Sequence, residues 1–335
     1  MGISVVKLPR VNLGHWPTPL HELPRLSATL GGPRIFVKRE DMTGLALSGN
    51  KFRKLEYVLA DAKQRGIDTI ITCGSLQSNS ALETAAAARK LEMEPYLVLF
   101  KGVHTEIQGN LLLANILNST IDILEIANPC EMFTVLPEKM NVVADELRGQ
   151  GRNPLVIPAG VLTPLGTAGW VNGAEEIGQQ LREQKIDAQY VVLANGSGGT
   201  QAGLVLGFKY LKLPLNVIGI SVLNEKTEAI DVVVTQVNET AKLLGLDIAI
   251  TPDEVTVYDD YIGRGYGIPT DKGIEAIKLV AQTEAIFLDP VYTGKAMSGL
   301  IDLIYRGYFT KKDTVLFIQT GGVAADFAYS VELSK

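Results

Sequence analysis

The chain has 335 residues, which exceeds the roughly 250–300 residues at which a single hydrophobic core stops growing, so two lobes are expected. A net charge of −6 argues against a general nucleic-acid binder, and no run of about 18 apolar residues predicts a membrane span. Two cysteines and three scattered histidines supply neither a disulfide framework nor the clustered ligands of a metal site, so no metal is expected.

Short apolar runs rich in Val and Ile alternate with longer segments of helical period along the whole chain. The predicted strands are Arg34–Lys38, Asp68–Cys73, Tyr96–Phe100, Asp122–Ile126, Leu155–Pro158, Tyr190–Ala194, Val217–Val222, Ile286–Asp289 and Thr314–Thr320. The predicted helices are Ala81–Lys90, Leu136–Gly149, Gly199–Leu211, Thr270–Thr283 and one that begins near Ser48–Asn50 and continues through Leu59.

This alternation predicts an α/β protein with two doubly wound lobes, each built on a parallel sheet. The strands are apolar throughout rather than at every second residue, which is typical of sheets covered on both faces. We assign residues 1–48 and 165–335 to a larger domain and residues 49–164 to a smaller one, with the proline-containing loop near Gly151–Thr167 as a crossover.

The stretch SGNKFRKLEY (Ser48–Tyr57) places a lysine where helix electrostatics disfavour one. Lys51 falls in the first turn of the predicted helix, where a cation costs roughly 0.3–1 kcal/mol, and Arg53 and Lys54 follow it. One interpretation is a solvated surface lysine. The other is an amine that is meant to lose its proton, because nearby positive charge lowers the pKa of an amine.

The segment ANGSGGT (Ala194–Thr200) joins a predicted strand to a predicted helix. Its glycines let several backbone N–H groups point at one ligand beside a helix N-terminus, which favours a single phosphate monoester. The spacing matches neither GxxxxGK[ST] nor a good GxGxxG. A glycine-rich turn that serves packing alone remains an alternative.

A phosphate site together with an isolated lysine suggests pyridoxal phosphate. Seven motifs then occur in order along the chain: KREDMTG (Lys38–Gly44), SGNKFRKLEY, GSLQSN (Gly74–Asn79), NGSGGT, GYGIP (Gly265–Pro269), LDPVYTGKAMSGL (Leu288–Leu300) and QTGG (Gln319–Gly322). Together they resemble the fold-type II pyridoxal-phosphate enzymes of the 1-aminocyclopropane-1-carboxylate deaminase and D-cysteine desulfhydrase family. The resemblance covers about residues 8–327 and implies a tryptophan-synthase-β-like architecture.

The resemblance also implies residue roles. Lys51 would join to the cofactor aldehyde and later move the Cα proton, with Tyr266, Tyr292 and Ser78 as further catalytic residues. Substrate would contact Ser78, Asn79, Ser80 and Tyr266. The cofactor would contact Lys51, Asn79, Gly196, Ser197, Gly198, Gly199, Thr200, Tyr292, Thr293 and Thr320. Taken singly, the two tyrosines could be core residues and Asn79 a helix cap.

The reaction is inferred from the residues expected near the cofactor ring nitrogen. The cyclopropane deaminase carries an acidic residue after the stacking tyrosine and a leucine before the late glycine pair, where this chain has Thr293 and Thr320. A carboxylate would keep the ring nitrogen protonated, whereas a threonine only shares a hydrogen bond. Thiolate is a good leaving group, with a thiol pKa near about 8.5. The pair also matches D-cysteine desulfhydrase.

We therefore favour a carbon-sulfur lyase that converts D-cysteine, or a similar β-substituted alanine, to pyruvate, ammonia and sulfide. Ser80 and Gln319 stand where relatives often have other polar residues, which leaves the substrate open. The alternatives are a 1-aminocyclopropane-1-carboxylate deaminase, an L-cysteate sulfo-lyase, and a non-catalytic sugar-phosphate or nucleotide-binding protein.

The expected partners are a small amino-acid substrate and a second copy of the chain, since members of this family are commonly homodimers. No nucleic acid or membrane partner is expected. The first 14 residues, MGISVVKLPRVNLG, lack the apolar core of a secretory signal, so a cytoplasmic location is expected.

Overall fold

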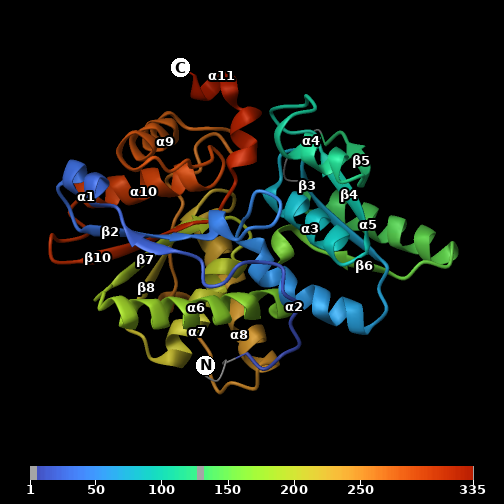
Figure 1. Cartoon of the computed structure of the whole chain (residues 1–335), viewed down its shortest axis with the longest axis horizontal. Coiled ribbons are helices and arrows are strands. Elements are labelled where there is room, and N and C mark those ends of the chain that lie inside the picture. Colours follow the sequence, from blue (N-terminus) through green and yellow to red (C-terminus); the bar gives the residue numbers. More distant parts are fainter. Residues whose placement is uncertain (1–5, 127–131, 335) are drawn as a thin grey trace.

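The computed structural model describes residues 6–126 and 132–334, which form two lobes with one sheet each (Figure 1). The larger sheet has the strand order β1-β2-β10-β7-β8-β9. Its strands are β1 (Leu20–Glu22), β2 (Arg34–Arg39), β7 (Tyr190–Asn195), β8 (Asn216–Ser221), β9 (Thr256–Tyr258) and β10 (Thr314–Gln319). All neighbours in it pair in parallel except β1, which runs antiparallel to β2.

The smaller sheet has the order β5-β4-β3-β6 and is parallel throughout. Its strands are β3 (Thr69–Ser75), β4 (Glu94–Phe100), β5 (Thr120–Leu124) and β6 (Pro154–Ile157). The helices of this lobe are α2 (Lys51–Gln64), α3 (Asn79–Lys90), α4 (Gly109–Ile116) and α5 (Met132–Gly149). In Figure 1 this lobe lies to the right of the larger one.

Helices cover both faces of the larger sheet, as its continuously apolar strands predict. On one face lie α1 (Pro24–Leu30), α9 (Asp271–Glu284) and α10 (Thr293–Tyr305); on the other lie α6 (Pro164–Gln184), α7 (Gly199–Leu211) and α8 (Lys226–Leu243) (Figure 1). The short α11 (Ser330–Leu333) closes the described part of the chain.

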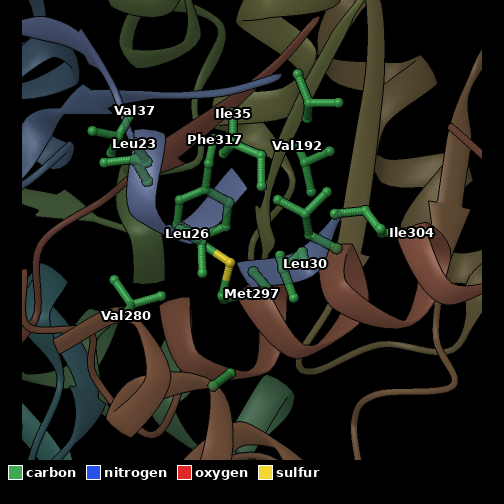
Figure 2. Close-up of a cluster of buried hydrophobic side chains, with 14 of the residues drawn as sticks. Leu23, Leu26, Leu30, Ile35, Val37, Val192, Val280, Met297, Ile304 and Phe317 are labelled. Carbon is green, nitrogen blue, oxygen red and sulfur yellow. The ribbon is translucent and has the colours of Figure 1, made fainter. Parts of the chain in front are cut away.

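Alternate residues of each strand enter opposite cores. Ile35 and Val37 of β2 pack with α1 and α10 in the cluster of Figure 2, whereas Phe36 between them joins the cluster under α6 and α7. Met297 and Ile304 of α10 contribute to the first cluster from one helix face.

The predicted two lobes on largely parallel sheets are confirmed, and most predicted strands lie within about two residues of a strand in the structure. One strand prediction is wrong, because Ile286–Asp289 is no strand. Ile286 and Leu288 are buried in the first cluster, so side-chain packing explains why they are apolar although they do not pair with another strand. The structure also adds the strand β1, which was not predicted and pairs antiparallel with β2. The domain boundaries themselves stay a prediction.

Candidate active site

The carboxyl ends of strands from both sheets approach a cavity of about 470 Å³. Parallel α/β sheets bind ligands at such strand ends. Most of the predicted site residues line this cavity: Lys51, Ser78, Asn79, Ser80, Gly196, Ser197, Gly198, Thr200, Tyr266, Tyr292 and Thr320. Segments that lie far apart in the sequence therefore meet as predicted. Gly199 and Thr293 are not part of the lining.

Lys51 is the first residue of α2, and its Nζ donates a hydrogen bond to Asn50 Oδ1 at 2.7 Å. Burial lowers the pKa of the amine, while the carboxylates of Glu83 and Asp289 raise it to a smaller extent. The direction agrees with the interpretation of an amine that gives up its proton. The cause differs from the predicted one, because desolvation lowers the pKa, and Glu83 and Asp289, whose charges act on the amine, are acidic.

Glu83 explains how a lysine is tolerated at this helix start. Its Oε2 accepts the backbone N–H of Lys51 at 2.9 Å, so a carboxylate from α3 caps α2. Gly49 lies two residues before Lys51. A Cβ on Gly49 would lie 2.3 Å from Glu83 Oε1. The glycine therefore admits the carboxylate to the end of α2.

The start of α3 places three polar residues at the cavity. Ser78 is the N-cap, and its Oγ accepts the N–H of Ala81 at 3.2 Å. Asn79 Oδ1 accepts a hydrogen bond from Asn110 Nδ2 at 2.7 Å, which leaves the Asn79 Nδ2 group as a donor. Ser80 Oγ is buried without a hydrogen-bond partner in the described chain. A helix N-terminus with free polar groups suits a carboxylate.

The glycine loop, which we define as Gly196–Gly199, leads from β7 into α7. Gly198 is the N-cap of α7 with φ of +81°, a left-handed conformation that glycine adopts without strain. A Cβ on Gly199 would lie 2.7 Å from Lys54 Nζ, so this amine lies directly behind the loop. The loop thus combines a helix N-terminus with a buried amine that an anion would favour in its charged form, which is an anion-binding arrangement.

Lys54 was not among the predicted site residues. It is fully buried, and its Nζ donates to the Gly160 carbonyl at 3.1 Å. Burial, and then the charge of Lys51, lower the pKa of Lys54 well below its ordinary value. The sequence signal was its position one helical turn after Lys51, which places both amines on one face of α2.

Tyr266 and Tyr292 meet at the cavity, with their hydroxyl oxygens 2.5 Å apart and their rings in an edge-to-face contact. Tyr292 also stands beside the glycine loop, because a Cβ on Gly196 would lie 3.3 Å from Tyr292 Cε1. Burial raises the pKa of both phenols, so both hydroxyls remain protonated at neutral pH. They can therefore donate hydrogen bonds.

The two threonines predicted at the ring nitrogen have different places. Thr320 lines the cavity. The Thr293 hydroxyl instead donates to Asp289 Oδ1 at 2.7 Å and accepts the Asp289 N–H at 2.8 Å. Asp289 also accepts the N–H groups of Val291, Tyr292 and Thr293, so it caps α10. Thr293 therefore serves the buried start of this helix.

The model of the family described as "Pyridoxal-phosphate dependent enzyme" matches residues 11–321 of the chain. The chain belongs to this family. Pyridoxal phosphate is therefore its cofactor, as the motifs predicted.

Two known proteins are similar to this pyridoxal-phosphate-dependent enzyme over nearly their full length. A D-cysteine desulfhydrase of Klebsiella pneumoniae (strain 342) is 41% identical over an alignment 335 residues long, and the alignment covers 98% of this chain and 99% of that protein. A crystal structure described as an ACC deaminase homologue has a TM-score of 0.90 and 37% identity, with 100% of this chain and 99% of that chain covered. The predicted fold-type II architecture is thereby confirmed.

The cavity fits pyridoxal phosphate on its own chemistry. It offers a buried amine of lowered pKa at Lys51, a glycine loop backed by Lys54, and a free amide donor at Asn79. Within residues 6–126 and 132–334 no group of His, Cys, Asp and Glu is arranged to hold a metal ion. The same residues include no helix long and apolar enough to cross a bilayer.

Proposed function

We propose that this pyridoxal-phosphate-dependent enzyme is a carbon-sulfur lyase acting on D-cysteine. With one water, D-cysteine would give pyruvate, ammonia and hydrogen sulfide, by loss of the Cα proton and cleavage of the Cβ–S bond. The full-length similarity to a D-cysteine desulfhydrase carries this proposal. The cavity is lined by Thr320 at the position expected near the cofactor ring nitrogen, where the cyclopropane deaminase would need a stronger electron-accepting ring, and this supports the lyase proposal.

The residues of the glycine loop, with Ser197, Thr200 and Lys54, would hold the cofactor phosphate. Lys51 would hold the cofactor aldehyde, Asn79 Nδ2 its phenolic oxygen, and Tyr292 its ring by stacking. Thr320 would share a hydrogen bond with the ring nitrogen. When bound, pyridoxal phosphate supplies an electron-accepting ring that stabilises negative charge at the Cα of an amino acid.

Lys51 is the proposed base. Because burial lowers the pKa of its amine, a larger fraction of Lys51 is neutral and able to accept the Cα proton at Nζ. Asn50 Oδ1, which accepts a hydrogen bond from Nζ at 2.7 Å, limits the directions in which the amine can point.

Ser78, Asn79 and Ser80 are proposed to orient the substrate carboxylate at the start of α3. The Ser80 hydroxyl, buried and unpartnered among the described residues, gains a hydrogen bond when a carboxylate binds. The Tyr266 and Tyr292 hydroxyls remain protonated and would donate to the departing sulfur. This stabilises the negative charge that develops there.

An assay of the holoenzyme with D-cysteine, L-cysteine, L-cysteate and β-chloro-D-alanine, side by side, tests the proposal. We expect the highest kcat/KM for pyruvate release with D-cysteine. A Lys51→Ala variant should lose this activity and the visible absorbance of the bound cofactor. Lys63→Ala changes an exposed lysine of the same helix and should retain both.

A second function, ring-opening deamination, is favoured by the structural similarity to the ACC deaminase homologue. The same preparation should be given 1-aminocyclopropane-1-carboxylate. If 2-oxobutanoate forms faster than pyruvate forms from D-cysteine, the deaminase assignment replaces the lyase assignment. If sulfite release from L-cysteate is faster than both, the enzyme is a sulfo-lyase.

The homodimer and the cytoplasmic location remain predictions. Light scattering coupled to size exclusion should give twice the mass of one chain. A monomeric mass would contradict the predicted dimer.

A further inference from the structure

The loop that carries Tyr266 has no helix or strand between Asp259 and Thr270. Gly263, Gly265 and Gly267 in this loop have φ values of +70°, +141° and +76°. Three glycines in the left-handed region give a backbone many accessible conformations. The position of a catalytic side chain on such a loop must therefore be determined by contacts from outside it.

Lys295 supplies two of these contacts. It lies in the first turn of α10, is fully buried, and its Nζ donates to the carbonyls of Ile262 at 2.7 Å and Gly265 at 3.0 Å. The position is unfavourable for a cation by helix electrostatics. Burial lowers the pKa of this amine to about 8, and the negative charge of Asp289, which caps the same helix, opposes that shift in part.

Tyr329 supplies a third contact from the C-terminal part of the chain. Its hydroxyl donates to the Gly267 carbonyl at 2.7 Å, and the residue is 3% exposed. The ring packs in a small apolar cluster with Val291, against which Tyr266 and Tyr292 lie. The carbonyls on both sides of Tyr266 are thus held, at residues 265 and 267.

We propose that Lys295 and Tyr329 are positioning residues that hold the Tyr266 hydroxyl against the Tyr292 hydroxyl. Lys295 lies three residues after Tyr292, at the start of the same helix. The start of α10 therefore positions Tyr292 directly. It positions Tyr266 through the two loop carbonyls that Lys295 contacts. Neither residue lines the cavity, so neither acts on substrate itself. The kinetic part of this proposal rests on the proposed lyase function.

Trypsin tests the positioning without any reaction. Arg264 is exposed within the loop and reports its order. In the holoenzyme, Lys295→Met and Tyr329→Phe should each raise the rate of cleavage after Arg264 at least about fivefold, since local opening controls such cleavage. Lys272→Met and Tyr305→Phe alter exposed residues and should leave it unchanged. Unchanged cleavage in Lys295→Met and Tyr329→Phe would overturn the proposal.

Kinetics then test whether the effect passes through Tyr266. Each single variant should lower kcat for D-cysteine about tenfold or more with a smaller change in KM, because small misplacement of a reacting group is costly. Combined with Tyr266→Phe, Lys295→Met should lower kcat no further. If the decrease in kcat of the double variant equals the product of the two single decreases, the proposal is overturned. If D-cysteine is not a substrate, the trypsin result alone decides the loop contacts.

Discussion

Glu83 Oε2 accepts a hydrogen bond from the backbone N–H of Lys51 at 2.9 Å. The contact joins two properties of the site, because one carboxylate caps α2 and also raises the pKa of the amine that the same residue carries. Burial in turn raises the pKa of Glu83 to about 8. Charge on either group therefore depends on the other.

Glu83→Gln should lower the pKa of Lys51 further, because the amide keeps an acceptor for the helix N–H but loses the negative charge. The pH dependence of acetylation of Lys51 in the apoenzyme, followed by mass spectrometry, measures this shift. Glu83→Ala removes the cap as well and should be about 1 kcal/mol less stable than Glu83→Gln. If the pH midpoint of Lys51 acetylation in Glu83→Gln is equal to or higher than that of the wild type, this explanation is wrong.

Lys54→Met should weaken the binding of pyridoxal phosphate at least about tenfold, which corresponds to about 1.4 kcal/mol. The apoenzyme should not lose stability, because a fully buried amine, whose pKa burial strongly lowers, is replaced by an apolar side chain of similar length. Equilibrium dialysis and urea unfolding measure the two effects. Lys63→Met is the matched control on α2. Reduced apoenzyme stability with unchanged cofactor affinity would show a structural role instead.

Thr293→Val and Thr320→Val should separate stability from catalysis. Thr293→Val removes two hydrogen bonds with Asp289 and should lower the free energy of unfolding by about 1–3 kcal/mol. Thr320→Val should change this free energy by less than about 0.5 kcal/mol yet reduce kcat for D-cysteine more than Thr293→Val does. Unfolding curves and steady-state rates of both variants check this, and the reverse pattern would assign the ring nitrogen to Thr293.

Asp326 makes the stability of the fold depend on pH. Burial, followed by the charge of Asp289, raises its pKa to about 8 from 3.8, and its Oδ1 is buried without a partner among the described residues. Between these pH values the folded state binds the extra proton. Its stability therefore falls as pH rises, by at most about 1.4 kcal/mol per pH unit from this group.

Asp326→Asn should remove this dependence. The variant should gain stability over the wild type as pH rises from 5.5 to 8, as measured by urea unfolding at each pH. Asp187→Asn, at an exposed aspartate, provides the control. A stability difference that is equal at both pH values would rule out titration of Asp326 as the cause.

Local patterns predicted most elements of this chain and the strand ends that line the cavity. Gly199–Leu211 was predicted with the bounds that α7 has, because a glycine-rich turn and a helical period mark both ends. The apolar pattern of Ile286–Asp289 could not distinguish a strand from a buried loop, since both need apolar residues. The short strands β1 and β9 each have three residues and carry too little periodicity to be recognised.

The sequence by itself determined the class of fold, the cofactor and most cavity residues, because these depend on local period, glycine positions and motifs in order. Only the tertiary structure decided that Thr320 faces the cavity while Thr293 binds Asp289, and that Lys54 and Glu83 belong to the site. Such assignments depend on which side of a helix or loop is buried against a distant segment. The contacts of Lys295 with residues 262 and 265 likewise join segments about thirty residues apart, and no local pattern contains them.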